Sequence, residues 1–139
     1  MIVDASVAAK WFLRGESHEK EALACRKDFE AGNVELTAPS LIMYEVGNSI
    51  WKRKDISGSL AANLAKTAAD YLGLIITQID GETAATALGL ARTLKVTFYD
   101  ASYLSLAQRL KKTFITADEQ LLQKLERTKF KAIHLSEYS

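Results

Sequence analysis

The chain has 139 residues, the length of one ordinary domain, and 48% of them are hydrophobic while 25% are charged. This balance excludes a disordered chain. The formal net charge is only +1, so a uniformly basic nucleic-acid binder is excluded too, and any contact with a polyanion must depend on local charge. The only cysteine is Cys25, which excludes an internal disulfide and fits a reducing compartment.

The chain shows no sign of export or membrane insertion. The start, Met1 to Asp4, has no basic segment followed by an apolar run, so no signal peptide is expected. No stretch reaches the roughly 20 apolar residues of a membrane span. Pro39 is the only proline, and no linker or repeat divides the sequence. We therefore expect one cytoplasmic domain over residues 1–139.

Strand and helix patterns alternate along the first half of the chain. Residues 2–4 read as a short strand, and Ser6 is a suitable N-cap for the helix that follows. A second helix is expected over residues 17–31, a strand over 35–38, and a third helix opened by Pro39 and running to about residue 53. Ser57 is placed to cap a fourth helix that ends near residue 73.

The second half continues the alternation. The β-branched, apolar residues 74–79 indicate a buried strand. Helices are expected from residue 80 or 81 to about 94 and from 97 to about 112, then a strand over 114–116, a helix over 117–127 and a last strand over 132–135. Strands separated by helices pair in parallel through right-handed crossovers. The pattern predicts an α/β protein, a three-layer α/β/α sandwich with a parallel sheet of about five strands.

Acidic residues fall where such a sheet binds its ligands, beyond the carboxyl ends of the strands. Asp4 ends the first strand, Glu45 lies in the second turn of an apolar helix, Asp100 opens a helix, and Asp118 follows the fourth strand. Neighbouring carboxylates repel one another and resist ionisation unless a cation lies between them. An all-oxygen set suits Mg²⁺ or Mn²⁺ rather than zinc. His18 and His134 are given no functional role.

Each acid also has a purely structural explanation. Asp100 and Asp118 stand in the first turn of expected helices, where the helix dipole favours an anion. Residues 116–119 fit a capping box in which Glu119 reaches back to Thr116. Glu45 resists this account because a lone glutamate among apolar neighbours requires a partner.

Two further sets of side chains lie near the expected first and third helices. The first is basic and is predicted to form a rim that guides RNA; ordinary surface charge is the alternative. It comprises Lys10, Arg14, Lys52, Arg53 and Lys54. The second is aromatic and apolar. Core packing explains most of its members, and a groove for a partner helix is the functional alternative. It comprises Trp11, Phe12, Tyr44, Ile50 and Trp51.

Four segments, in order along almost the whole chain, resemble the PIN-domain family, and within it the VapC-type toxin ribonucleases of toxin–antitoxin pairs. They are Ile-Val-Asp-Ala-Ser from residue 2, Tyr-Glu-Val-Gly-Asn from residue 44, Phe-Tyr-Asp-Ala-Ser-Tyr-Leu from residue 98 and Phe-Ile-Thr-Ala-Asp from residue 114. The resemblance implies a sheet of strand order 3-2-1-4-5 and a metal-dependent endoribonuclease that leaves a 5′-phosphate and a 3′-hydroxyl.

The resemblance also implies site residues and partners. Asp4, Glu45, Asp100 and Asp118 match the family's acidic positions, and all four are expected to serve catalysis and to hold the Mg²⁺ or Mn²⁺ ion. Ser6 and Thr116 match its hydroxyl positions as supporting residues. Glu119, an additional acid, has no assigned role. RNA is the implied substrate, and a homodimer and a cognate antitoxin are implied partners.

Two other classes of function remain open. One is a PIN-like fold without catalysis that binds RNA or protein; the costly acidic cluster argues against it. The other is a phosphoacceptor receiver domain, which is also doubly wound. A receiver requires paired acids at the end of its first strand, and this chain offers only Asp4 there.

Overall fold

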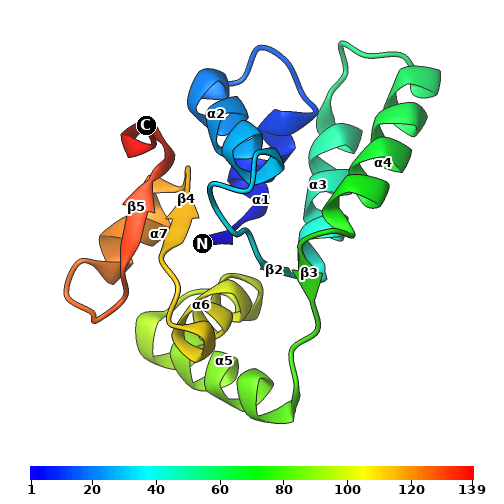
Figure 1. Ribbon diagram of the computed structural model, residues 1–139. Helices are drawn as coiled ribbons and strands as arrows, with labels where there is room; N and C mark the ends of the chain where they lie inside the picture. The colour runs from blue at the N-terminus through cyan, green and yellow to red at the C-terminus, as the bar shows by residue number, and fades with distance from the viewer.

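A computed structural model describes all residues, 1–139 (Figure 1). The first half contains β1 (Ile2–Val3), α1 (Ala5–Ala8), the 3₁₀ helix η1 (Ala9–Trp11), α2 (Glu19–Glu30), β2 (Ala38–Pro39), α3 (Leu41–Lys52) and α4 (Gly58–Leu72). The second half contains β3 (Ile76–Thr77), α5 (Gly81–Leu94), α6 (Phe98–Leu110), β4 (Phe114–Thr116), α7 (Glu119–Leu125), β5 (Ala132–His134) and the 3₁₀ helix η2 (Leu135–Glu137). The predicted alternation of strands and helices is confirmed. The strand expected over residues 74–79 is shorter, Ile76–Thr77, and only half-buried, so its predicted burial is wrong.

The sheet consists of two parallel parts that meet at one joint. β1 pairs with β4 and β4 with β5, while β2 pairs with β3. A single parallel bridge between Ile2 and Thr37 connects the parts. There the Val3 amide donates to the Thr37 carbonyl at 3.2 Å and the Thr37 amide to the Met1 carbonyl at 3.0 Å. The order across this joint is β3-β2-β1-β4-β5, as the family resemblance implied.

Several helices begin where the sequence predicts. The side-chain oxygens of Ser57, Asp80 and Thr97 accept hydrogen bonds from the backbone amides of Leu60, Thr83 and Asp100, and so cap α4, α5 and α6. Each such bond satisfies an amide that has no partner within its own helix. Gly32, with a φ of 76°, follows α2 as expected for a helix stop.

Three expected helix starts are wrong. Asp4, not Ser6, is the N-cap of α1, because its carboxylate reaches the Val7 amide. Pro39 belongs to β2, where it pairs with β3, and α3 begins only at Leu41. The cap of α7 is Asp118, which accepts from the Leu121 amide. Thr116 is buried in β4 and its hydroxyl serves Asp4, so the predicted capping box does not form.

One cluster of 28 buried residues forms the core. The strands supply Ile2, Val3, Phe114 and Ile115, all fully buried, as a sheet covered by helices requires. Helix α6 contacts β1, β2 and β4, so it crosses the joint between the two parts of the sheet, and α5 packs along it. None of the helices has the length and apolar character needed to traverse a lipid bilayer.

Candidate active site

Asp4 lies at the carboxyl end of β1 and is almost completely buried. Its Oδ1 accepts hydrogen bonds from the Ser6 hydroxyl at 2.6 Å and the Val7 amide at 3.3 Å, and its Oδ2 accepts from the Thr116 hydroxyl at 2.5 Å. Burial raises the pKa of Asp4 from 3.8 to about 6; these donors oppose the shift, and the charge of Glu45 adds to it. The carboxyl is therefore rigidly held in a site that disfavours its negative charge.

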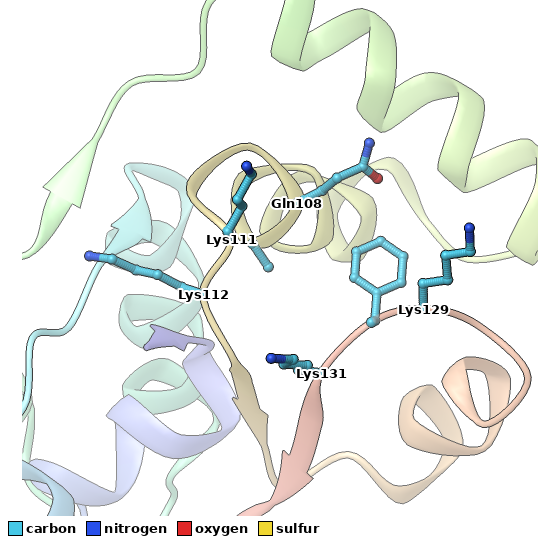
Figure 2. A pocket seen from close by; sticks show the side chains of 7 residues that line it. Gln108, Lys111, Lys112, Lys129 and Lys131 are labelled. Carbon is cyan, nitrogen blue, oxygen red and sulfur yellow. The ribbon is translucent and has the colours of Figure 1, made fainter.

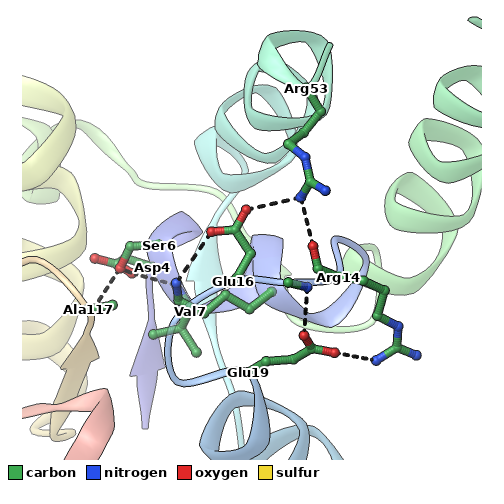
Figure 3. Close-up of polar contacts among 10 residues, drawn as sticks. Asp4, Ser6, Val7, Arg14, Glu16, Glu19, Arg53 and Ala117 are labelled. Carbon is green, nitrogen blue, oxygen red and sulfur yellow. Dashed lines mark hydrogen bonds and ion pairs between the residues drawn. The ribbon is translucent and has the colours of Figure 1, made fainter. Parts of the chain in front are cut away.

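The two predicted hydroxyl residues connect Asp4 to the end of β4. The Ser6 hydroxyl accepts a hydrogen bond from the Ala117 amide at 2.8 Å, and the Thr116 hydroxyl accepts from the Asp118 amide at 3.0 Å. Figure 3 shows Asp4 at the end of β1, with Ser6 and Ala117 beside it. The segment that carries Asp118 is thus fixed relative to Asp4, although more than 100 residues separate them.

One carboxylate oxygen of Asp118 accepts a hydrogen bond within the protein, and the other accepts none. As the N-cap of α7 its Oδ1 accepts from the Leu121 amide at 3.0 Å. The residue is exposed, so the other carboxylate oxygen faces solvent beyond the carboxyl end of β4. A capping role and a ligand role are compatible here, because each uses a different oxygen.

Glu45 in α3 is held by Tyr103, for which no role in the site was expected. The Tyr103 hydroxyl, from α6, donates to Glu45 Oε1 at 2.7 Å. Burial raises the pKa of Glu45; the Tyr103 hydrogen bond lowers it and the charge of Asp100 raises it. Burial and the neighbouring Glu45 also raise the pKa of Tyr103, so its proton stays on the phenol oxygen. The predicted need of Glu45 for a partner is met by this phenol.

Asp100 stands in the first turn of α6, half-buried, next to its N-cap Thr97. Burial raises its pKa first; the Thr97 hydroxyl and the charge of Lys124 lower it, and the charge of Asp118 raises it. Asp100 does stand in the first turn of a helix, as the purely structural explanation predicted. The repulsion from Asp118 shows that it also faces another acid.

Besides burial, the charge of another acid helps to raise the pKa of three of the four acids: Glu45 acts on Asp4, Asp100 on Glu45, and Asp118 on Asp100. They come from three helices and one strand end, all beyond the carboxyl ends of β1 and β4. No three acidic, histidine or cysteine side chains converge tightly enough to surround one ion directly. A hard cation that keeps several of its waters fits this set, since its donors are all oxygens.

Tyr103 is the site residue that sequence reasoning missed. A signal was present: it lies three residues after Asp100, so both face the same side of α6. Buried tyrosines commonly belong to the core, and Tyr103 does pack near Phe114. Glu119, at the first position of α7, is exposed and forms no side-chain hydrogen bond or ion pair, so it still has no role.

The five basic residues of the predicted rim differ in their surroundings. Lys10 is only 7% exposed and lies 3.9 Å from Glu16, so its placement on an exposed rim is wrong; its stem is buried with α1 and η1. Arg53 binds Asp55 through two bonds of 2.7 Å. It also binds Glu16 at 3.2 Å, as Figure 3 shows. Arg14 pairs with Glu19 at 2.8 Å.

Lys52 and Lys54 are the two members of that rim that remain exposed and form no ion pair. The Lys54 ammonium lies 5.2 Å from the centre of the Trp51 ring, in cation–π contact. Within this rim, unpaired positive charge is therefore found only at and just after the end of α3.

The aromatic and apolar set divides in two. Trp11, Phe12 and Ile50 are buried in the core, which confirms the packing explanation for them. Tyr44 and Trp51 are 76% and 68% exposed. Seven residues separate the two on α3, so they lie on one outer face of that helix. Only this part of the set remains available to a partner.

The fold and the acidic edge define a class of protein, the parallel α/β domains with a carboxylate cluster at the carboxyl ends of their strands. A model of the PIN domain matches residues 1–128. The chain belongs to the PIN-domain family, and the resemblance seen in its four sequence segments is confirmed. PIN domains are generally nucleases. A search of curated protein sequences finds no significant match.

Solved structures share this fold. The crystal structure of PAE2754 from Pyrobaculum aerophilum is 26% identical, with a TM-score of 0.67, and the alignment covers 97% of this chain and 90% of that one. The crystal structure of Mycobacterium tuberculosis VapC20, described as a Sarcin-Ricin loop cleaving toxin, is 14% identical with a TM-score of 0.68, covering 88% of this chain and 92% of that one. The predicted three-layer α/β fold class is confirmed.

Proposed function

We propose that this PIN domain is a Mg²⁺- or Mn²⁺-dependent endoribonuclease that hydrolyses RNA phosphodiester bonds. One observation carries the proposal: Asp4, Glu45, Asp100 and Asp118 all lie beyond the carboxyl edge of the sheet, where burial, with a neighbouring acid, raises the pKa of Asp4, Glu45 and Asp100. Such a cluster costs folding energy and is relieved by a cation. A purely structural role does not require four acids at one edge of the sheet.

Asp4 and Asp118 would hold the cation most directly, with Asp100 and Glu45 binding it or its waters. When bound, the ion supplies a lowered pKa for a coordinated water and compensation of the charge that develops on the phosphate. The chain's own part is positioning. Ser6 and Thr116 fix both oxygens of Asp4, while Glu45 Oε2 is left to orient the attacking water and receive its proton.

Tyr103 completes this positioning. Its hydroxyl occupies Oε1 of Glu45, which sets the side chain's orientation and counteracts the effect of burial on its pKa. A group that accepts a proton works best with a pKa near the working pH. Burial and the Tyr103 hydrogen bond act on the pKa of Glu45 in opposite directions, and their balance determines that value.

RNA would approach along the end of α3, where Lys52 and Lys54 offer unpaired charge. Arg14 and Arg53 would join them only by exchanging their present carboxylate partners. The expected consequence is a shallow dependence of RNA affinity on salt, since few phosphates would be neutralised.

The proposal extends to a toxin role in a toxin–antitoxin pair, in a cytoplasmic, single-domain and homodimeric protein. The likeness of fold to VapC20 supports it, as do the exposed rings of Tyr44 and Trp51, which suit an apolar partner surface. Tyr44 is the direct neighbour of Glu45, so an antitoxin on this face of α3 would lie close to the acids.

A second candidate function is a PIN-like module that binds RNA or protein without cleaving it. The observation that favours it is that no three ionisable side chains converge on one ion position. Calorimetric titration with Mn²⁺ separates the two: a nuclease binds the ion, and a silent module does not.

Cleavage of RNA in Mg²⁺ or Mn²⁺, compared with excess EDTA, tests the main proposal. We expect activity that EDTA abolishes and that Asp4→Asn lowers at least 100-fold. Asp70→Asn is the matched control, since Asp70 is an exposed carboxylate on α4 with no ion pair. EDTA-resistant cleavage, or equal activity of Asp4→Asn and the control, would overturn it.

A further inference from the structure

A concave site lies at the edge of the sheet opposite the acids. It is a cavity of about 440 Å³, within the size range of small-molecule sites. Its lining combines the last turn of α6 and the loop that follows it with the loop before β5. The residues of this lysine cavity are Ala107, Gln108, Lys111, Lys112, Lys129, Phe130 and Lys131.

The charge of the lysine cavity is of one sign. Four of its seven lining residues are lysines and none is acidic, although the chain as a whole carries a net charge of only +1. Lys112 is already bound, to Glu35 at 2.9 Å and to the Thr37 hydroxyl at 3.2 Å. Lys111, Lys129 and Lys131 form no ion pair. Figure 2 shows Lys111 and Lys112 beside the end of α6 and Lys129 and Lys131 beside β5; the Lys112 side chain points away from the hollow.

Helix chemistry explains only part of this arrangement. Lys111 and Lys112 follow the end of α6, where positive side chains compensate the helix dipole. Lys129 and Lys131 lie four and six residues beyond the end of α7 and flank Phe130 on the approach to β5. Their presence beside the end of α6 is not required by either helix. Like charges placed together in one hollow repel, and an anion would relieve them.

Two of the remaining lining residues, Phe130 and Gln108, are suited to contact a nucleic-acid base. Phe130 contributes an aromatic ring that is only partly buried, and bases of any sequence stack on such rings. The Gln108 side chain carries both a donor and an acceptor, as a base edge does. We propose that the lysine cavity binds a nucleoside phosphate, with its phosphate on Lys111, Lys129 and Lys131 and its base against Phe130.

That nucleoside phosphate is either a free nucleotide or one residue of an RNA strand. The cavity precedes β4 and β5, whereas Asp4 and Asp118 follow β1 and β4. Both edges cannot therefore contact the same phosphate, and the site is separate from the proposed cleavage centre. Binding here needs neither the acids nor a metal ion.

Titration of isotope-labelled protein followed by amide NMR tests the proposal. The titrations use 5′-AMP, inorganic phosphate and a ten-nucleotide single-stranded RNA, all in EDTA. We expect AMP to shift the amide signals of residues 107–112 and 129–131 and to bind more tightly than phosphate. Shifts there with RNA as well assign the site to an RNA strand, and shifts with AMP alone assign it to free nucleotides; both results support the proposal.

Two variants and a control sharpen the test. Replacing Lys111, Lys129 and Lys131 by Gln should weaken AMP binding at least 10-fold, and should reduce the salt slope of RNA binding by about 2 if RNA is the ligand. Phe130→Leu should weaken AMP several-fold and leave phosphate unchanged. The control replaces Lys20, Lys27 and Lys66, three exposed lysines elsewhere, and should have little effect on either ligand.

Three results would overturn the proposal. They are no AMP- or RNA-dependent shift at residues 107–112 and 129–131 of the unmodified protein, equal weakening by the control, and equal affinity for AMP and phosphate. The first does not depend on any variant folding. Because EDTA prevents metal-dependent cleavage, failure here leaves the proposed nuclease activity untouched, and failure of the nuclease test leaves this site untouched.

Discussion

Asp4 shows how one residue serves fold and site together. It ends β1, caps α1 through the Val7 amide and accepts the hydroxyl of Thr116 from β4. These contacts hold its carboxyl rigid, and its burial raises its pKa to about 6. The same side chain is therefore a stabilising hydrogen-bond acceptor and an unfavourable buried charge.

The stability of the metal-free protein should depend on pH through Asp4. Its pKa is about 6 when folded and returns to about 3.8 on unfolding. The contribution of its protonated form is complete below pH 4 and is lost as the pH rises through 6. Two pKa units correspond to about 3 kcal/mol. Between pH 4 and 8 in EDTA, Asp4→Asn should gain up to about 3 kcal/mol relative to the unmodified protein.

Denaturant unfolding at a series of pH values measures this difference. Asp70→Asn, which changes an exposed carboxylate, should follow the unmodified protein at a constant offset. Parallel stability curves for Asp4→Asn and the unmodified protein would contradict the assignment of a raised pKa to Asp4.

Tyr103→Phe should alter the pH dependence of activity. It removes the donor to Glu45 Oε1 and leaves burial and Asp100 to raise the pKa of Glu45 further. A lost hydrogen bond of roughly 1–1.5 kcal/mol corresponds to about one pKa unit. The acidic limb of the rate profile should move up by about that amount. Tyr99→Phe, an exposed tyrosine of the same helix, should leave it in place, and an unmoved limb in Tyr103→Phe would reject this role.

Whole elements set the position of the remaining acids. Asp100 and Asp118 both depend on a helix start, since one stands in the first turn of α6 and the other caps α7. The first turn of a helix frays easily, because its amides lack partners within the helix. A cap at this point therefore fixes a site residue as well as a helix.

Thr97→Ala should separate the effect of a cap on helix stability from its effect on the position of Asp100. Loss of a threonine N-cap costs about 1 kcal/mol of stability, and fraying of the first turn of α6 should displace Asp100 and lower activity about 10-fold. Ser57→Ala removes the equivalent cap of α4, a helix that carries none of the four acids. It should cost similar stability in thermal unfolding and little activity. Equal activity losses in both variants would show that general destabilisation, not Asp100, is responsible.

At this scale the sequence predicts the order and type of elements, since apolar periodicity is a local property. Prediction from the sequence fails where a side chain interacts with a residue that is distant in the chain. Thr116 and Ser6 resemble caps in sequence, yet their hydroxyls serve Asp4 and the Ala117 amide. Lys10 resembles a surface residue, yet packing of η1 buries it. Tyr103 acquires its role only when α3 and α6 meet, a contact that no local pattern contains.

Acidic and basic side chains gather at different places on the molecule, although its net charge is only +1. The acids gather beyond the carboxyl ends of the strands, and the lysine cavity lies at their opposite ends. Family resemblance indicates the acids because they stand in the four shared segments. Lys129 and Lys131 lie outside those segments, and their meeting with Lys111 depends on the tertiary fold.

Divalent cations should stabilise the folded protein as a whole. An ion that binds only the folded state at 100 times its dissociation constant adds about 2.7 kcal/mol, which raises the melting temperature by several degrees for a chain of this length. Thermal unfolding with Mg²⁺ or Mn²⁺ should show this shift for the unmodified protein and for Asp70→Asn. Asp118→Asn should lose most of it. An undiminished shift in that variant would place the ion elsewhere.

The two parts of the sheet are joined by the backbone hydrogen bonds of a single bridge, which is the weakest strand pairing in the sheet. Glu45 belongs to the part with β2, and Asp4 to the part with β1; one bridge joins the strands, and the helix α6 and the packing of α1 on α3 hold the two parts together. Warming should loosen this pairing first and carry Glu45 away from Asp4 while most helices remain intact. Catalytic activity should then be lost at a temperature several degrees below that at which the helical circular dichroism signal is lost. Loss of both at the same temperature would mean that the two parts of the sheet unfold together.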